Sequence, residues 1–236
     1  MPEKLDETMP DRIAFFLIAG VYTSPDFMEA LGGELVRRAR QAGIAGIHSR
    51  LLFPYGDWGR SLLGQLREVR RDLNLSMRKR ARSVGGQFVL RETAEYRDGW
   101  RIVLIGHSAG GLAAVHALEL LKSRKPLADC RVVQIGSPKC RIPDGLRSSV
   151  GYLYAAGPQG GIRDPVCRLG TWGGWERGRF RGPVWNRRLY RPGRVVPLQL
   201  IGGHADYFRD HRPYLNGAGV TNLDVTVDAF WPLILP

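Results

Sequence analysis

Cysteine is scarce in this sequence, which argues against a fold stabilised by disulfide bonds or by structural zinc. The 236 residues contain three cysteines, Cys130, Cys140 and Cys167. Their number is odd, no two of them form a Cys-x-x-Cys pair, and no histidine lies near them at metal-ligand spacing. Disulfide-stapled domains need paired cysteines, and structural zinc sites need closely spaced cysteine and histidine ligands. We therefore expect neither a disulfide framework nor a bound metal.

Long hydrophobic runs and internal repeats are also missing. The longest apolar run, from Ile13 to Val21, is too short for a bilayer span, which needs about 20 residues. Residues 1–12 (MPEKLDETMPDR) are polar and acidic, whereas a secretory signal peptide joins a basic start to an apolar stretch. No linker long enough to divide the chain is found. We expect a single domain over residues 1–236, located in the cytoplasm.

Acidic side chains are few relative to basic ones. Lysine and arginine number 35 against 22 aspartates and glutamates, giving a formal net charge of +13 and a pI near 10.3. Such an imbalance favours an anionic partner: an acidic membrane surface, a negatively charged substrate or nucleic acid. The alternative is a solvated basic surface without a partner, because net charge bears on association rather than on fold. No RNA-binding signature accompanies the charge, so nucleic acid is the least favoured partner.

Apolar runs alternate with helical patterns along the chain. Helices are expected where apolar residues recur at helical spacing, over residues 27–43, 57–82 and 109–125. Strands are expected over residues 12–21, 44–53, 100–106, 130–136, 150–156 and 194–202. Pro197 confines the last strand to a sheet edge or a bulge. Alternation of this kind predicts an α/β fold with a doubly wound, mostly parallel sheet between two helical layers, a three-layer sandwich.

One short stretch, residues 102–111 (IVLIGHSAGG), places a serine between two glycines where a strand passes into a helix. Glycines on both sides relieve crowding in a turn that holds Ser108 at strained backbone angles. Because Ala109 begins a helix, its N–H group points to the same place and can stabilise an oxyanion. The stretch lacks the lysine of a phosphate loop and does not fit the pattern G-x-G-x-x-G. These features favour a catalytic serine.

The segment GHSAGG resembles the nucleophile turn of lipases and esterases with the α/β-hydrolase fold. That family carries its catalytic residues in the order serine, acid, histidine. In this sequence "RDPV" (163–166) resembles the acid loop of class 3 lipases, "GGHADYF" (202–208) resembles their histidine loop, and "IGSPKCR" (135–141) resembles a segment that follows the nucleophile. The resemblance therefore implies an α/β-hydrolase with the triad Ser108, Asp164 and His204.

The alternative acids, the oxyanion donors and the substrate contacts complete the expected site. Asp144, Asp206 and Asp210 remain alternatives to Asp164, because sequence fixes triad geometry poorly. The expected oxyanion hole combines the N–H group of Ala109 with one from "IAGVYTS" (18–24), where Val21 is favoured over Tyr22. Substrate contacts are expected from four side chains, those of Tyr22, His107, Trp172 and Trp175.

Two segments are rich in arginine. Residues 165–195 combine three tryptophans with eight arginines and one acid, Glu176. They are interpreted either as a lid or substrate wall, or as a surface excursion whose tryptophans pack on the domain. Residues 67–82 (REVRRDLNLSMRKRAR) are interpreted as a solvated helix face whose apolar stripe enters the core, with contact to an anionic surface as the alternative.

Together these observations predict a serine hydrolase that cleaves carboxylic esters through an acyl-enzyme on Ser108, without metal or organic cofactor. The expected substrate is a small-molecule ester or a lipid, with an anionic group and membrane-surface contact left open. A thioesterase or acyl transferase uses the same triad. A non-catalytic binding protein on the same fold is the rival from another class. The sequence indicates no oligomeric state.

Overall fold

A computed structural model describes residues 11–96, 99–124, 129–178 and 182–235. Residues 1–10, on which most of the expectation about a leader rests, lie outside the described residues. So do residues 179–181 within the arginine-rich segment 165–195.

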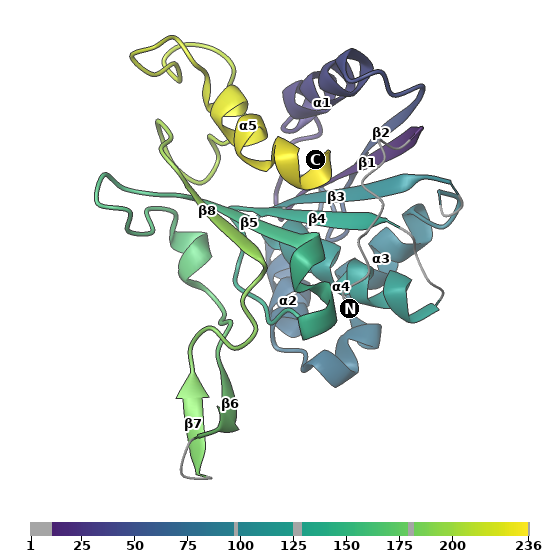
Figure 1. Cartoon of the computed structure of the whole chain (residues 1–236), viewed down its shortest axis with the longest axis vertical. Helices are drawn as coiled ribbons and strands as arrows, with labels where there is room; N and C mark the ends of the chain where they lie inside the picture. Colours follow the sequence, from purple (N-terminus) through teal and green to yellow (C-terminus); the bar gives the residue numbers. More distant parts are fainter. Residues whose placement is uncertain (1–10, 97–98, 125–128, 179–181, 236) are drawn as a thin grey trace, which may run out of the picture.

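The centre of the molecule is a six-stranded parallel sheet in the order β2-β1-β3-β4-β5-β8 (Figure 1). After β1 the chain forms β2 on one side and then returns to place β3 on the other side of β1. Ligand sites of such sheets lie where this reversal separates the strand ends. The strands are β1 (Arg12–Ile18), β2 (Gly46–Leu52), β3 (Arg101–His107), β4 (Cys130–Ile135), β5 (Val150–Ala155) and β8 (Arg194–Leu198).

Helices cover both faces of the sheet, which confirms the predicted doubly wound, three-layer arrangement. Helices α1 (Glu29–Gln41) and α5 (Asn222–Ile234) cover one face, and α2 (Leu62–Leu73), α3 (Val84–Glu92) and α4 (Ala109–Arg124) lie on the other (Figure 1). Short 3-10 helices span Met77–Arg82 (η1), Asp144–Ser149 (η2) and Pro165–Arg168 (η3). Among the described residues, none of the helices has the length and apolar character that crossing a membrane requires.

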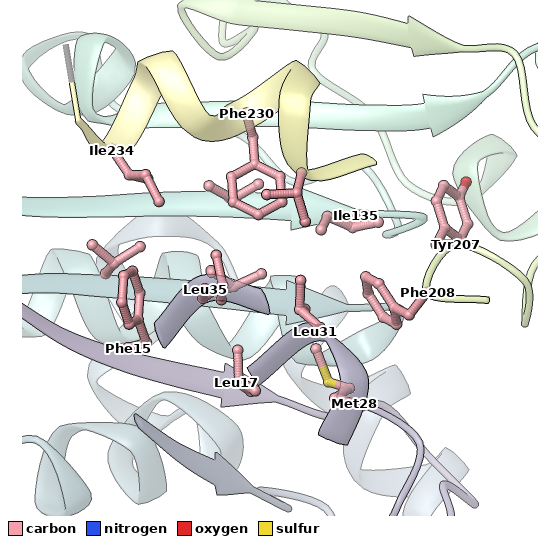
Figure 2. Packing of buried hydrophobic residues seen from close by; sticks show 14 of the residues in the cluster. Phe15, Leu17, Met28, Leu31, Leu35, Ile135, Tyr207, Phe208, Phe230 and Ile234 are labelled. Carbon is pink, nitrogen blue, oxygen red and sulfur yellow. The ribbon is translucent and has the colours of Figure 1, made fainter. Parts of the chain in front are cut away.

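The first strand shows why its sequence, RIAFFLI, is apolar without interruption. Successive side chains point to opposite faces of a strand, and both faces here are covered. Phe15 and its alternate neighbours pack against α1 and α5, whereas Phe16 and its neighbours pack against α3 and α4. Each such side chain contributes about 1.5–3 kcal/mol by leaving water. Figure 2 shows the α1–α5 side of this core, which ends beyond Ile135 at Tyr207 and Phe208.

The helix predicted over residues 57–82 is wrong in its length. Helix α2 ends at Leu73, η1 follows, and α3 begins at Val84, where no helix was expected. The cause is Asp72, which is fully buried and accepts hydrogen bonds from the Ser83 hydroxyl (2.7 Å) and from the Gly85 N–H group (2.9 Å). A carboxylate at the start of α3 satisfies N–H groups that a helix leaves free, so Asp72 folds the chain back.

The apolar stripe predicted for this helix packs inward only in part. Val69 and Leu73 pack against the core, whereas Leu62, Leu63 and Leu66 are exposed. The buried residues of α2 are Gln65 and Asp72. Gln65 donates to the backbone carbonyl groups of Asp57 (2.6 Å) and Arg60 (3.0 Å). Hydrogen bonds hold Gln65 and Asp72 inward, and the first three leucines of α2 face solvent.

The last third of the chain adds a hairpin and a helix, neither of which was predicted, to the predicted edge strand. A hairpin of β6 (Gly174–Arg177) and β7 (Pro183–Asn186) projects from the body of the molecule (Figure 1). Strand β8, with Pro197, forms one edge of the sheet, as predicted. Helix α5 was not predicted, although the sequence holds its capping box, in which the Thr221 hydroxyl and the Asp224 carboxylate each accept the other residue's N–H group.

Two glycines give opposite expectations for stability. Gly33 lies in α1 with no atom within 4 Å of where a Cβ would stand, whereas a Cβ on Gly110 would stand 1.9 Å from the carbonyl oxygen of Ile18. Gly33→Ala should raise the free energy of unfolding by about 0.5–1 kcal/mol, because alanine reduces the entropy of the unfolded chain. Gly110→Ala should lower it by about 1–3 kcal/mol or more through overpacking. Urea unfolding of both variants checks this, and equal changes would contradict it.

Candidate active site

Ser108 lies on a tight turn between β3 and α4, with a positive φ of 55°. Few non-glycine residues adopt such an angle. Its N–H group donates to the carbonyl oxygen of Ile135 (3.0 Å). A Cβ on Gly106 would stand 2.4 Å from the backbone of Gly110, so the two flanking glycines are required by close backbone packing. The predicted strand–turn–helix setting of Ser108 is therefore present.

The segment after β1 passes directly against this turn. A Cβ on Gly20 would stand 2.7 Å from Ser108 Cβ and 3.3 Å from the backbone nitrogen of Ala109. The next residues, Val21 and Tyr22, were the two expected sources of a second oxyanion donor. The N–H group of Tyr22 donates to Gln65 Oε1 (2.8 Å) and is therefore already engaged. Val21 remains the predicted donor beside Ala109.

His204 and Asp164 come together from two different loops. Asp164 follows β5, His204 follows β8, and His204 Nδ1 lies 2.8 Å from Asp164 Oδ2. Because the strands are parallel, both loops leave the same edge of the sheet as Ser108. The alternative acids are engaged elsewhere. Asp144 pairs with Arg147, Asp206 accepts from the Gly203 N–H group, and Asp210 lies 3.1 Å from His211.

Asp164 is fully buried, and its surroundings favour the charged form. Burial alone would raise the pKa of Asp164, but hydrogen bonds from His204, the Tyr207 hydroxyl and the Val166 N–H group lower it below its ordinary value. The Tyr207 hydroxyl donates to Asp164 Oδ2 (2.9 Å) and accepts from the Ala155 N–H group (2.8 Å). Sequence reasoning did not assign Tyr207 a role. The signal was a tyrosine three residues after His204.

His107 lies beneath His204 rather than at the surface. The two rings stack with their centroids 4.7 Å apart, and His107 Nε2 lies 2.9 Å from the carbonyl oxygen of His204. A carbonyl oxygen can only accept, so Nε2 carries the proton. Burial, followed by the neighbouring His204, lowers the pKa of His107 to about 3. These contacts favour a role in positioning His204. The predicted substrate contact of His107 stays a prediction.

One link of the expected triad is not formed. Among the hydrogen bonds of the described residues there is none between Ser108 and His204. His204 stacks on His107, the residue that precedes Ser108 in the sequence. Nucleophile and base often approach more closely only when substrate binds. The transfer of a proton from Ser108 to His204 thus stays a prediction.

The two tryptophans expected to contact substrate lie in different surroundings. The Trp172 ring packs edge-on against Tyr152 (4.9 Å) and under the Lys139 ammonium group (5.4 Å). Trp175 lies in the hairpin, 67% exposed, and pairs with Trp185 across the two strands (5.4 Å). The aromatic contacts of the described residues do not join either of them to His204. Their predicted role as a lid or substrate wall remains untested.

Two large apolar side chains are exposed at the oxyanion segment, those of Tyr22 (61% exposed) and Trp58 (59%). Leu62, Leu63 and Leu66 of α2 are exposed as well. Gln65 joins α2 to this segment through its bond to Tyr22, and the Trp58 N–H group donates to the carbonyl oxygen of Thr23 (3.3 Å). Large clustered apolar side chains at a surface mark a place where apolar groups bind.

The other chemistry-bearing residues that the structure describes are not grouped as metal ligands, and the cysteines among them are buried. In the part of the chain that the structure describes, no three His, Cys, Asp or Glu side chains are grouped to hold a metal ion. Cys130, Cys140 and Cys167 are buried and unpaired. Burial, as the largest cause, raises the thiol pKa to about 12, about 11 and about 12, respectively. The thiols are therefore uncharged at neutral pH.

The buried imidazole of His107 predicts a pH dependence of stability. The pKa of His107 is about 3 in the folded protein, against 6.5 for an unperturbed histidine. Between these two pH values the unfolded chain binds a proton at His107 that the folded protein does not bind. Stability is then lost as pH falls below about 6.5, by about 1.4 kcal/mol per pH unit. His107→Gln should flatten the pH dependence of the urea unfolding free energy by that slope. His211→Gln, an exposed histidine, should not. Parallel curves for wild type and His107→Gln would contradict this expectation.

Comparison with known proteins gives remote likenesses. No protein-family model matches the sequence, and no curated protein matches it. A phospholipase PlaB from Legionella pneumophila, solved with thio-NAD, is 15% identical with a TM-score of 0.32, over 53% of this chain and 25% of its own. A cutinase-like protein from Cryptococcus sp. is 14% identical with a TM-score of 0.34, over 94% of this chain and 95% of its own. Similarity this low does not identify an activity, so the function is inferred from the site itself.

Proposed function

We propose that the protein is a serine hydrolase that cleaves carboxylic esters through an acyl-enzyme on Ser108. His204 acts as the general base and acid, and Asp164 orients the imidazole. The single observation that carries the proposal is the 2.8 Å contact between His204 Nδ1 and the buried Asp164, at the sheet edge where Ser108 occupies a strained turn. A buried carboxylate on one imidazole nitrogen leaves the other nitrogen free to accept a proton from a serine.

The proposed reaction has two halves. Ser108 Oγ attacks the ester carbonyl carbon while His204 Nε2 takes the hydroxyl proton. The carbonyl oxygen becomes an oxyanion that the N–H groups of Ala109 and Val21 stabilise. As the intermediate collapses, His204 returns the proton to the leaving alkoxide, which departs as an alcohol. Water then attacks the acyl-enzyme with the same base, releasing the acid and the free serine.

The supporting residues fit these roles. The depressed pKa of Asp164 keeps it ionised at neutral pH, which stabilises the imidazolium that forms in each half-reaction. Tyr207 and His107 hold Asp164 and His204 through one hydrogen bond each. Orientation by fixed neighbours saves the entropy of aligning the groups at the moment of reaction.

The exposed side chains of Tyr22 and Trp58 favour esters with an apolar acyl or alcohol part. They border the segment that carries the proposed oxyanion donor Val21, so an apolar group held there lies next to Ser108. An alkyl chain that covers such side chains contributes roughly 0.8 kcal/mol per buried methylene group. The proposed substrates are accordingly hydrophobic esters, including lipid esters. A thioester with the same acyl chain would fit the same site.

Labelling by a fluorophosphonate probe tests the nucleophile. The wild-type protein should take one label, and Ser108→Ala should take none. The labelling rate of His204→Ala should fall by about 100-fold or more, because the base is missing. Asp164→Asn should also be slowed, since it favours the wrong tautomer. Ser148→Ala, an exposed serine, is the matched control and should label fully.

Labelling that persists in Ser108→Ala would contradict the proposal. A folded wild-type protein that takes no label would favour the binding-protein alternative. A series of p-nitrophenyl esters from acetate to palmitate, with the matching thioesters, then defines the substrate. Rates that rise with acyl length are expected from the exposed side chains of Tyr22 and Trp58.

A further inference from the structure

A hollow lies away from the candidate active site, on the side of the sheet covered by α2 and α4. It has a volume of about 400 Å³ and is enclosed by the end of α2, by η1, and by the loops that follow β4 and η3. His116 of α4 borders it, eight residues beyond Ser108, or roughly 12 Å along a helix that rises 1.5 Å per residue. None of the proposed triad residues lines it.

The lining of this hollow is strongly cationic. Arg80, Lys139 and Arg141 line it, and no aspartate or glutamate does. Arg80 pairs with Glu119 outside the lining. In the part of the chain that the structure describes, Lys139 and Arg141 form no ion pair. Lys139 lies over the Trp172 ring (5.4 Å), and Arg141 donates to the carbonyl oxygen of Gly173 (2.8 Å).

Arg80 is the most buried of these three cations and is held by hydrogen bonds. It is 4% exposed, and its guanidinium donates to Glu119 and to the carbonyl oxygen of Arg141 (2.7 Å). Its Nε atom is buried without a hydrogen-bond partner. An unsatisfied buried N–H group is costly, and the charges of Lys139 and Arg141, which no carboxylate of the described residues pairs with, repel one another. A bound anion would relieve the repulsion.

We propose that this hollow binds a phosphate group, either free or as part of a small organic phosphate ester. A phosphate carries up to two negative charges and several strong acceptor oxygens, which match guanidinium and ammonium donors. The exposed hydroxyl groups of Ser76 and Thr171 line the same hollow and supply neutral donors. The volume exceeds that of a phosphate ion and leaves room for an organic part. This site is independent of the proposed ester hydrolysis.

The site also gives a role to the basic segment 67–82. Its residues from Leu73 to Met77, together with Arg80, form one wall of the hollow. Arg71, Arg78 and Lys79 are exposed around that wall. Clustered surface charge of one sign concentrates anions near a concave site and speeds their association. Part of the net charge of +13 would then serve a phosphate ligand rather than the active site.

Calorimetric titration with inorganic phosphate, and separately with a soluble short-chain phosphatidate, tests the site at constant ionic strength. Lys139→Gln should weaken binding about tenfold or more, the effect of losing one charge-assisted hydrogen bond. Lys79→Gln, the matched loss of charge outside the lining, should change the affinity less than about twofold. Thr171→Asp should abolish binding by placing a negative charge in the hollow, while its carboxylate still accepts from the Gly173 N–H group.

The outcomes separate the two sources of phosphate. Saturable binding of inorganic phosphate that depends on Lys139 supports a site for the free ion. Binding of phosphatidate alone, with the same dependence, supports a lipid phosphate. Absence of saturable heat with both probes overturns the proposal. Equal weakening by Lys139→Gln and Lys79→Gln also overturns it, because the binding is then a diffuse surface effect. Circular dichroism and urea unfolding of each variant verify that it is folded.

Discussion

The close approach of two backbone segments at the ends of β1 and β3 is the constraint on which the site depends. Gly20 passes so near Ser108 that a Cβ would stand 2.7 Å from the serine's own Cβ, and Gly110 leaves no room between α4 and Ile18. Ser108 has a positive φ of 55° at this contact, and the segment that leads to Val21 passes close to the backbone nitrogen of Ala109. The reversal of strand order between β1 and β3 makes the contact available.

Support for the other two proposed groups comes from the α1–α5 side of the core. Tyr207 is fully buried there and holds both Asp164 and the end of β5, while His107 carries the backbone and ring of His204. Phe208 packs beside them (Figure 2). Because Tyr207 lies three residues from His204, one short segment carries both the imidazole and the group that holds its carboxylate.

The parallel sheet and the Ser108 turn were predictable, because apolar runs and flanking glycines are local signals. The approach of Asp164 to His204 was expected only from the resemblance of their two loops to those of class 3 lipases. The break between α2 and α3 was not, since it depends on Asp72 accepting hydrogen bonds from residues beyond its own helix. The exposure of Leu63 was missed for a related reason. Periodicity shows that a helix has two faces, and tertiary hydrogen bonds such as those of Gln65 decide which face turns inward.

Trapping the acyl-enzyme tests the proposed role of Ser108 most directly. The protein would be mixed with p-nitrophenyl acetate, quenched in acid during turnover, digested and examined by peptide mass spectrometry. One acetyl group on the peptide that contains Ser108, absent when His204 is replaced by alanine, is the predicted result. Steady release of p-nitrophenol with no acetyl group on that peptide, or with the group on another residue, would contradict the proposal.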